Sequence, residues 1–203
     1  MVGPLQNNSY LVVDEPTHRA ALIDPGMDGE RVLEVVRKEG LTLEALIITH
    51  GHFDHVASLQ AFKAATGAPV IMHPADVPLL AEAPETARYF GCAATAPPPP
   101  DRLVREGEVI QVGGLAFRVL ETPGHTLGGI SLCLGDGVFV GDALFAGSVG
   151  RTDLPGGSLP DLLRSIRTRL LTLPDSTMVY AGHGPQTTIG AERRDNPFLQ
   201  EIG

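Results

Sequence analysis

The sequence predicts an α/β protein of two halves, each built from a β-sheet and helices, with the two sheets stacked against each other. Strands and helices alternate along the first half of the chain. After the four prolines at 97–100, short strands separated by G-G, T-P-G and G-D-G turns are typical of an antiparallel sheet. Each half ends with a strand that stops at a histidine beside a glycine, a repetition that two stacked halves explain.

Turn residues and hydrophobic periodicity place the elements of the first half. Two runs of β-formers around the D-E-P-T-H-R turn predict a hairpin. Between Asp28, a candidate N-cap, and Gly40, a candidate left-handed cap, the apolar residues at 32, 33, 35 and 36 share one helix face. The expected order is strands 5–13 and 20–24, helix 28–40, strand 45–49, helix 55–66, strand 68–72 and a short helix after Pro74.

The second half is predicted to hold four strands, a helix and a last strand. These elements occupy residues 108–112, 115–121, 130–134, 138–140, 159–173 and 178–181 in that order. The four prolines before them have fixed φ angles and no backbone donors, so we expect an extended connector there. A chain of 203 residues can bury one sizeable core, and we expect one domain over 1–203.

The composition disfavours several classes of protein. The chain has 24 acidic and 15 basic residues, and its formal net charge of −9 disfavours binding to nucleic acid or to an anionic membrane surface. Its two cysteines show no metal-ligand spacing, so neither a disulfide framework nor a thiolate zinc site is expected. The start of the sequence lacks a secretory signal, and no segment reaches a membrane-spanning length. We therefore expect a soluble cytoplasmic protein.

Four potential metal ligands lie within six residues, in the stretch T-H-G-H-F-D-H that follows the predicted strand 45–49. His50 and His52 are two positions apart, so a near-extended backbone directs both the same way. Asp54 and His55 are adjacent at the start of a helix, where their side chains diverge by about 100°. One short loop can therefore supply ligands to two metals.

Three further candidate ligands also follow predicted strands: His125 comes after T-P-G, and Asp142 and His183 each come after a glycine. Imidazole and carboxylate ligands without thiolate suit zinc, iron or manganese, and among these we expect zinc. Taken singly, Asp54 would be a helix N-cap and Asp142 a turn residue. Five of the seven histidines lie beside glycine or aspartate at strand ends, which favours a metal site.

The T-H-G-H-F-D-H motif, with the later G-H, G-D and G-H, resembles the metallo-β-lactamase superfamily over nearly the whole chain. The stretches L-I-D-P-G, T-P-G-H-T-L-G-G, G-D-A-L-F-A-G-S-V-G-R-T-D-L-P-G-G and A-G-H-G-P-Q-T-T-I-G-A-E-R are similar, in that order, to the short glyoxalase II-like (hydroxyacylglutathione hydrolase-like) enzymes. The resemblance implies a four-layer αββα sandwich of two mixed sheets. It also implies a first metal on His50, His52 and His125, a second on Asp54, His55 and His183, and a bridging Asp142.

The activity implied by the resemblance is hydrolysis of a thioester of a small acyl-thiol, of the S-lactoylglutathione type, by a hydroxide that bridges two divalent ions. No serine or cysteine nucleophile is then needed. Asp54 is expected to orient the hydroxide as well as to bind metal. Asp24, in I-D-P-G at another strand end, is expected either to hold a ligand histidine or to form a simple turn.

The sequence departs from glyoxalase II at the regions that contact glutathione. Full-length glyoxalase II enzymes continue into a helical region, whereas this sequence ends about twenty residues after His183. A basic residue of the larger members has a counterpart in Arg151, but two positions on, where they carry a tyrosine, this sequence has Asp153. Arg151 is therefore expected either to bind a substrate carboxylate or to brace its loop through Asp153.

Other activities remain open at this point. A persulfide dioxygenase would hold a single iron on His50, His125 and Asp142, and a metal-binding or sensing module would hold metal without turnover. True β-lactamases usually carry a cysteine where this chain has Asp142, which disfavours lactam hydrolysis, and the net charge disfavours the nucleases of the superfamily. His18 and His73 are assigned no role. The sequence predicts no oligomeric state.

Overall fold

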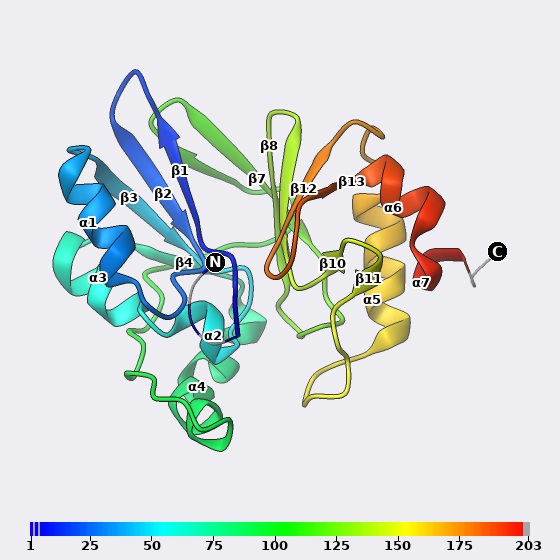
Figure 1. Ribbon diagram of the computed structural model, residues 1–203, viewed down its shortest axis with the longest axis horizontal. Coiled ribbons are helices and arrows are strands. Elements are labelled where there is room, and N and C mark those ends of the chain that lie inside the picture. The colour runs from blue at the N-terminus through cyan, green and yellow to red at the C-terminus, as the bar shows by residue number, and fades with distance from the viewer. Residues whose placement is uncertain (2, 4, 201–203) are drawn as a thin grey trace.

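The computed structural model describes residues 1, 3 and 5–200 and contains two large β-sheets that face each other, with helices on both outer sides (Figure 1). Helices α1 (Glu30–Lys38) and α3 (Leu59–Thr66) cover the outer side of the N-terminal sheet. Helices α5 (Leu159–Ser165) and α6 (Ile189–Asp195) cover the outer side of the C-terminal sheet. These four layers confirm the predicted αββα fold.

The N-terminal sheet has five strands, and only its first pair is antiparallel. Their order across the sheet is the order of the chain: β1 (Tyr10–Asp14), β2 (Arg19–Ile23), β3 (Thr42–Ile47), β4 (Val70–Met72) and β5 (Arg102–Leu103). Because β2 to β5 run in parallel, the loops that follow them lie at the same edge of the sheet.

The C-terminal sheet has six strands: β13 (Thr187–Thr188), β12 (Met178–Ala181), β9 (Gly137–Gly141), β8 (Ile130–Leu134), β7 (Leu115–Glu121) and β6 (Val109–Val112). Neighbouring strands are antiparallel except β12 and β9, which are parallel. The antiparallel arrangement expected for the four strands over 108–140 is therefore confirmed in β6 to β9. The parallel pair arises because the chain crosses over through α5 before it returns as β12, which makes the sheet a mixed one, as expected. A small separate hairpin joins β10 (Leu144–Phe145) to β11 (Ser148–Val149).

Alternate residues along the strands build cores on the two faces of each sheet. In β2, Ala20 and Leu22 join the core under α1 and α3, whereas Ala21 and Ile23 face the other sheet. Phe117 of β7 is fully buried between the two sheets. This alternation explains why both sheets must be covered on their outer sides.

The remaining helical segments lie in connections and at the C-terminal end: α2 (Phe53–Val56), η1 (Pro74–Asp76), α4 (Val77–Tyr89), the π-helical η2 (Ile166–Leu170) and α7 (Pro197–Gln200). The short helix expected after Pro74 is in fact the thirteen-residue α4, which continues through Pro84. The predicted helix 159–173 is divided between α5 and η2. None of the helices within residues 1, 3 and 5–200 is long and apolar enough to cross a membrane.

Contacts with residues far away in the sequence change two of the predicted helices. One is interrupted, and the other begins later than expected. The helix expected over 55–66 is interrupted at Ala57 and Ser58, because the Ser58 amide donates to the Pro25 carbonyl and its hydroxyl accepts from the Gly29 amide. Asp28 does not cap α1, which begins at Glu30. Its carboxylate accepts a hydrogen bond from the Gly3 amide instead.

Two further expectations in the first half need correction. Val35 does not share the buried face of α1, since its side chain is 45% exposed while Leu33 and Val36 are buried. Residues 5–9 do not belong to the hairpin, because β1 begins at Tyr10. They run instead to the loop after β12, where Asn7 forms a β-bridge with His183.

Candidate metal centre

The predicted ligands lie at one edge of the sandwich, each just beyond the end of a strand. The chain leaves β3 for the histidine-rich loop and leaves β7, β9 and β12 for one further ligand each. Parallel pairing of β2 with β3 and of β9 with β12 brings these strand ends to the same edge. The side chains brought together there are His50, His52, Asp54, His55, His125, Asp142 and His183.

Three histidines form the first group of ligands. His50, His52 and His125 each offer a ring nitrogen within 4.8 Å of the others. His52 Nδ1 lies 2.9 Å from His125 Nε2, and the ring of His50 is 4.9 Å and 4.8 Å from the rings of His52 and His125. All three are buried. Their nitrogens could hold one metal ion.

A carboxylate and two histidines form the second group. Asp54, His55 and His183 also offer donor atoms within 4.8 Å of one another. Asp54 Oδ2 lies 3.2 Å from His183 Nε2 and 3.5 Å from His55 Nε2, and the two imidazole nitrogens are 3.3 Å apart. This group could hold a second ion.

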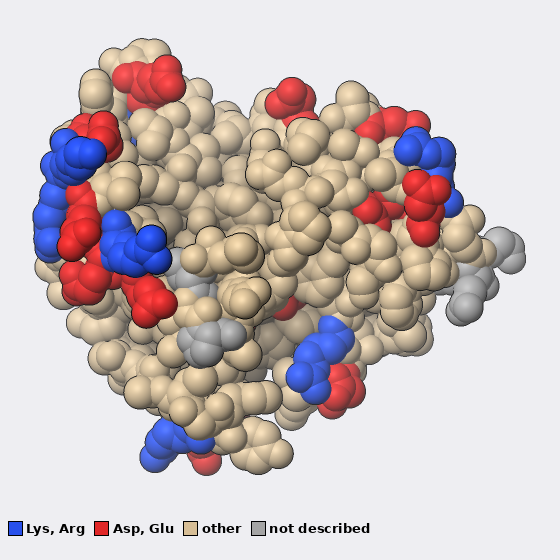
Figure 2. All heavy atoms as spheres, viewed as in Figure 1, with Lys and Arg blue, Asp and Glu red and all other residues tan. Residues whose placement is uncertain are grey.

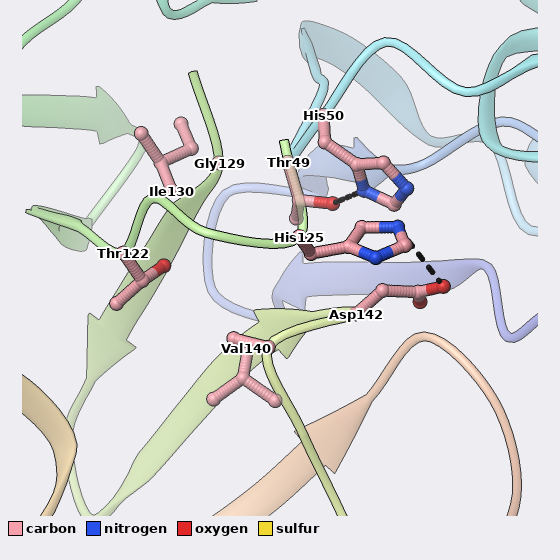
Figure 3. Close-up of a pocket in the computed structure, with 9 residues that line it drawn as sticks. Thr49, His50, Thr122, His125, Gly129, Ile130, Val140 and Asp142 are labelled. Atoms are coloured by element: carbon pink, nitrogen blue, oxygen red, sulfur yellow. Dashed lines mark hydrogen bonds and ion pairs between the residues drawn. The ribbon is translucent and has the colours of Figure 1, made fainter. Parts of the chain in front are cut away.

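Asp142 faces both groups. Its Oδ1 lies 3.4 Å from His55 Nε2, and its Oδ2 lies 3.6 Å from both His125 Nε2 and His183 Nε2. Figure 3 shows the rings of His50 and His125 side by side, with the Asp142 carboxylate next to the tip of the His125 ring. The residues drawn there line a void of about 10 Å³, close to the space that one water needs. Asp142 therefore has the position that a bridging carboxylate requires.

The Nδ1 atoms of three candidate ligand histidines are held by acceptors. His125 Nδ1 donates to the Arg151 carbonyl (2.7 Å), His183 Nδ1 to the Leu5 carbonyl (3.1 Å) and His55 Nδ1 to Asp24 Oδ2 (3.0 Å). In each ring Nδ1 therefore carries a proton, and Nε2 is the atom that faces the other candidate ligands. A carbonyl or carboxylate behind each histidine is the usual environment of a metal ligand.

His50 is held in the same way through Thr49, a residue that the sequence analysis missed. The Thr49 hydroxyl donates to Asp24 Oδ2 (2.6 Å), so its oxygen accepts from His50 Nδ1 (3.0 Å). His50 Nε2 is buried and has no hydrogen-bond partner, and neither has Asp142 Oδ1. Buried polar atoms are rarely left without partners, so these two atoms fit a site that binds a cation.

Asp24 combines the two roles expected for it. Its backbone adopts a left-handed φ of 50°, as a turn residue can, and its carboxylate is 2% exposed. Oδ1 accepts from the Thr49 amide (2.7 Å), and Oδ2 accepts from the Thr49 hydroxyl and from His55 Nδ1. Asp24 thus contacts one ligand histidine directly and a second through Thr49.

The pKa values of the ligands separate the two groups. Burial lowers the pKa of His50 well below its usual value, and burial together with His125 lowers the pKa of His52 to about 3. Burial would also lower the pKa of His55, but Asp142, Asp54 and Asp24 outweigh it and raise the pKa to about 10. His50 and His52 are therefore neutral imidazoles, whereas the second group attracts positive charge.

The carboxylates of Asp54 and Asp142 account for that attraction. Burial would raise the pKa of Asp54, but His55 and His183 hold it below its usual value, while Asp54 and Asp142 raise the pKa of His183 against the effect of burial. Among residues 1, 3 and 5–200, the ion-pair partners of Asp54 and Asp142 are all histidines. Buried carboxylates without lysine or arginine partners are costly unless a cation compensates them. The donor set therefore fits divalent metal ions.

A cavity of about 420 Å³ opens over the ligands, and its walls are largely apolar. Figure 2 shows a hollow in the lower middle of the molecule, with a basic and an acidic side chain at its border. The cavity contacts the ligands His52, Asp54, His125, Asp142 and His183. Its apolar walls include Leu5, Phe53, Phe90, Phe145, Val149 and Leu154. This volume is typical of small-molecule sites.

Arg151 lines this cavity but is already paired. Its Nε and Nη2 donate to the two carboxylate oxygens of Asp153, both at 2.8 Å, which is the loop-bracing geometry. Both side chains are exposed, and Nη1 has no role in the pair. Of the two roles expected for Arg151, the pairing with Asp153 that holds the loop is present in the structure. A substrate carboxylate could still reach Nη1.

Asp76 is a second residue that the sequence analysis missed. It is 1% exposed, and its carboxylate binds backbone amides next to the first group of ligands. Of the two histidines without an assigned role, His18 is exposed in the β1–β2 turn. His73 is buried, and its Nε2 lies 3.0 Å from Glu121 Oε1.

Comparisons with known proteins agree with the motif and the fold. A family model described as "Metallo-beta-lactamase superfamily" matches residues 2–183. The chain is 41% identical over 202 residues to hydroxyacylglutathione hydrolase GloC of Haemophilus influenzae, covering 98% of this chain and 95% of the relative. It is 38% identical to the probable metallo-hydrolase YqgX of Bacillus subtilis, covering 98% and 94%.

Three solved structures resemble the whole chain. BLEG-1 B3 metallo-beta-lactamase has a TM-score of 0.92 at 38% identity, covering 100% of this chain and 97% of that one. TTHA1623 in a di-iron-bound form has a TM-score of 0.89 at 45% identity, with 98% of both chains covered. ETHE1 from Myxococcus xanthus has a TM-score of 0.84 at 36% identity, covering 100% and 84%. The resemblance expected from the motifs is confirmed, and the chain belongs to the metallo-β-lactamase superfamily.

Proposed function

We propose that this protein is a two-metal hydrolase that cleaves the thioester bond of a small acyl-thiol of the S-lactoylglutathione type. The observation that carries the proposal is the pair of three-ligand groups with the Asp142 carboxylate between them, at the floor of the cavity. The relative named hydroxyacylglutathione hydrolase supports the substrate class, and TTHA1623, described in a di-iron-bound form, supports two metals. We propose zinc, and iron or manganese fit the same ligands.

When bound, a pair of divalent ions lowers the pKa of a shared water and stabilises negative charge on a carbonyl oxygen. The side chains of the protein position the attacking water and the metal ligands. Asp54 reaches the cavity and is 7% exposed, so its carboxylate can accept a hydrogen bond from the attacking water and align it with the thioester carbon. The acceptors behind His55, His125 and His183 keep these rings from turning during the reaction.

The cavity walls support a small thioester as the substrate. Phe53, Phe90 and Phe145 offer apolar surface to the acyl or thiol part and limit the entry of bulk water. Among the described residues that line the cavity, Arg151 alone is a lysine or arginine, and it is paired with Asp153. Arg151 is therefore proposed as a contact for a substrate carboxylate only through Nη1.

The complete second group favours hydrolysis over the two alternatives. A persulfide dioxygenase with a single iron on His50, His125 and Asp142 would leave Asp54, His55 and His183 without a metal, although their donor atoms lie within 4.8 Å of one another. A sensing module needs no substrate cavity above its ligands, whereas this site lies at the floor of one. Both observations support a two-metal enzyme.

The test combines metal content with parallel activity assays. Purified protein is analysed for bound elements, and it is then assayed for thiol release from S-lactoylglutathione and for sulfite formation from glutathione persulfide. A chromogenic cephalosporin is added to the panel because BLEG-1 is described as a β-lactamase. We expect two metal ions per chain and thiol release as the dominant activity.

Matched variants connect the activity to the site. His52→Ala and His183→Ala each remove one ligand and are expected to lower turnover by at least about 100-fold. His18→Asn is the control, because His18 is exposed in a turn and its φ of 54° suits asparagine. One iron per chain with oxygen uptake would establish the dioxygenase instead. Bound metal with no turnover in any assay would establish the sensing module.

A further inference from the structure

A buried carboxylate ties together the two loops that supply the first group of ligands. Asp76 lies at the junction of η1 and α4, and Figure 1 labels α4 in the lower part of the molecule. Its Oδ2 accepts from the Gly51 amide at 2.9 Å, and its Oδ1 accepts from the Gly128 amide at 2.6 Å. Gly51 lies between His50 and His52, and Gly128 lies three residues after His125. One carboxylate thus spans both ligand loops.

The ordinary role of an aspartate at this position does not explain these contacts. Aspartate before a helix usually caps it by accepting a hydrogen bond from an amide of the first turn. Asp76 is the N-cap residue of α4, yet its side chain makes no such bond. Both oxygens point instead to loops 25 and 52 residues away in the sequence. The side chain serves the ligand loops rather than its own helix.

The two glycines that meet Asp76 allow the close approach. A Cβ at Gly128 would lie 2.6 Å from the Asp76 amide nitrogen, and a Cβ at Gly51 would lie 2.8 Å from the Leu80 amide nitrogen. Real Cβ atoms do not approach backbone so closely, so any other residue would push either loop away from the start of α4. The contact is therefore built from both loops and from the carboxylate.

Ionised acceptors make stronger hydrogen bonds than neutral ones, and the N-terminal end of α4 favours a negative charge beside it. With Asp76 in place, the loops hold His52 Nδ1 and His125 Nε2 only 2.9 Å apart. We propose that Asp76 is a positioning residue that fixes the spacing of these loops and so sets the affinity of the first metal group. The inference rests on the metal sites of the proposed function, and it extends to neither the second group nor the substrate.

Asp76→Asn tests the role with little change in shape. The amide keeps one acceptor but presents an NH₂ group to the other backbone amide, so one of the two bonds is lost. We expect the zinc affinity of the first group to fall roughly 10- to 100-fold, while the second group keeps its affinity. Competition with a chromophoric chelator measures both affinities, and His52→Ala identifies the signal of the first group. Cobalt substitution adds an absorption spectrum that reports the first coordination sphere.

A matched variant separates positioning from general stability. Glu192 is also a buried carboxylate, 4% exposed, and it accepts from the Gly147 amide, the Thr187 hydroxyl and the Asn196 amide group. Glu192→Gln should lower the melting temperature but leave both zinc affinities unchanged. If Asp76→Asn retains wild-type affinity in the first group, or weakens both groups equally, the inference is wrong.

A second variant tests the same inference if Asp76→Asn does not fold. Gly128→Ala leaves the carboxylate in place but pushes the His125 loop away from it, and it should weaken the first group alone. Unchanged zinc affinity in this variant would also overturn the inference. Because metal affinity is measured rather than turnover, a protein that binds two zinc ions but cleaves no thioester refutes the proposed activity and leaves the role of Asp76 standing.

Discussion

Replacing Asp142 with asparagine removes one negative charge from the centre of the site and almost nothing else. The carboxylate lies 3.4 Å from His55 Nε2 and 3.6 Å from His125 Nε2 and His183 Nε2, so it faces ligands of both groups. Its Oδ1 is buried and has no hydrogen-bond partner among the described residues. An amide has the same shape, so the variant is expected to fold.

The expected loss of metal affinity follows from the charge. Two unit charges about 4 Å apart interact with about 4 kcal/mol at an effective dielectric constant of about 20. At about 1.4 kcal/mol for each factor of ten, Asp142→Asn should weaken metal binding by roughly 1,000-fold. Hydrolysis should fall in parallel, because both groups lose the negative charge that they share.

The assay is metal content after dialysis against a weak chelator, measured beside turnover. Asp136→Asn is the matched control, because Asp136 also follows a glycine and precedes β9, at the opposite end of the same strand, where it is exposed. The control should keep two ions and full activity. If Asp142→Asn also keeps two ions at wild-type affinity, the carboxylate does not bridge them and the reasoning is refuted.

Three further predictions concern the substrate loop, the pH dependence and the metals. Asp153→Asn frees the Arg151 guanidinium and should lower KM for S-lactoylglutathione by a few-fold with little change in kcat; an unchanged KM would mean that Arg151 only braces its loop. Hydrogen bonds from Thr17 and from the Gly114 amide lower the pKa of Asp14, so this carboxylate stabilises the fold above its unfolded pKa of about 4, and the contribution is lost as pH falls through the lowered value. Chemical denaturation of Asp14→Asn should accordingly show less acid destabilisation below about pH 4 than the wild type, and parallel curves would contradict this role. Chelation should abolish hydrolysis and lower the melting temperature, since an ion at 100 times its Kd contributes about 2.7 kcal/mol, and zinc should restore both; activity that survives chelation would count against a metal enzyme.

The candidate ligands could be found from the sequence because their chemistry is local. His50, His52, Asp54 and His55 are neighbours in the chain, and strand periodicity placed each of the other ligands at the end of a strand. Strands that run in parallel bring such ends to one edge, so a group of scattered residues could be expected to meet there. The core strands were found for the same reason, since their apolar runs are continuous.

Other features of the fold and of the site could not be predicted from the sequence, because no local pattern indicates them. Asp76 lies near the start of a helix, where aspartate is common, and its partners are the backbone amides of Gly51 and Gly128, which any residue except proline would possess. The interruption between α2 and α3 depends on Pro25 and Gly29, far away in the chain. Strands β5, β10, β11 and β13 have two residues each, too few to show a period. Tertiary contacts decide all of these features.

The most direct test of the two-metal site is a crystal structure of the zinc-loaded protein with anomalous diffraction recorded at the zinc edge. We predict two peaks about 3.5 to 4 Å apart, one among His50, His52 and His125 and the other among Asp54, His55 and His183, with Asp142 between them. A single peak, or two peaks that lie away from these side chains, would contradict the account.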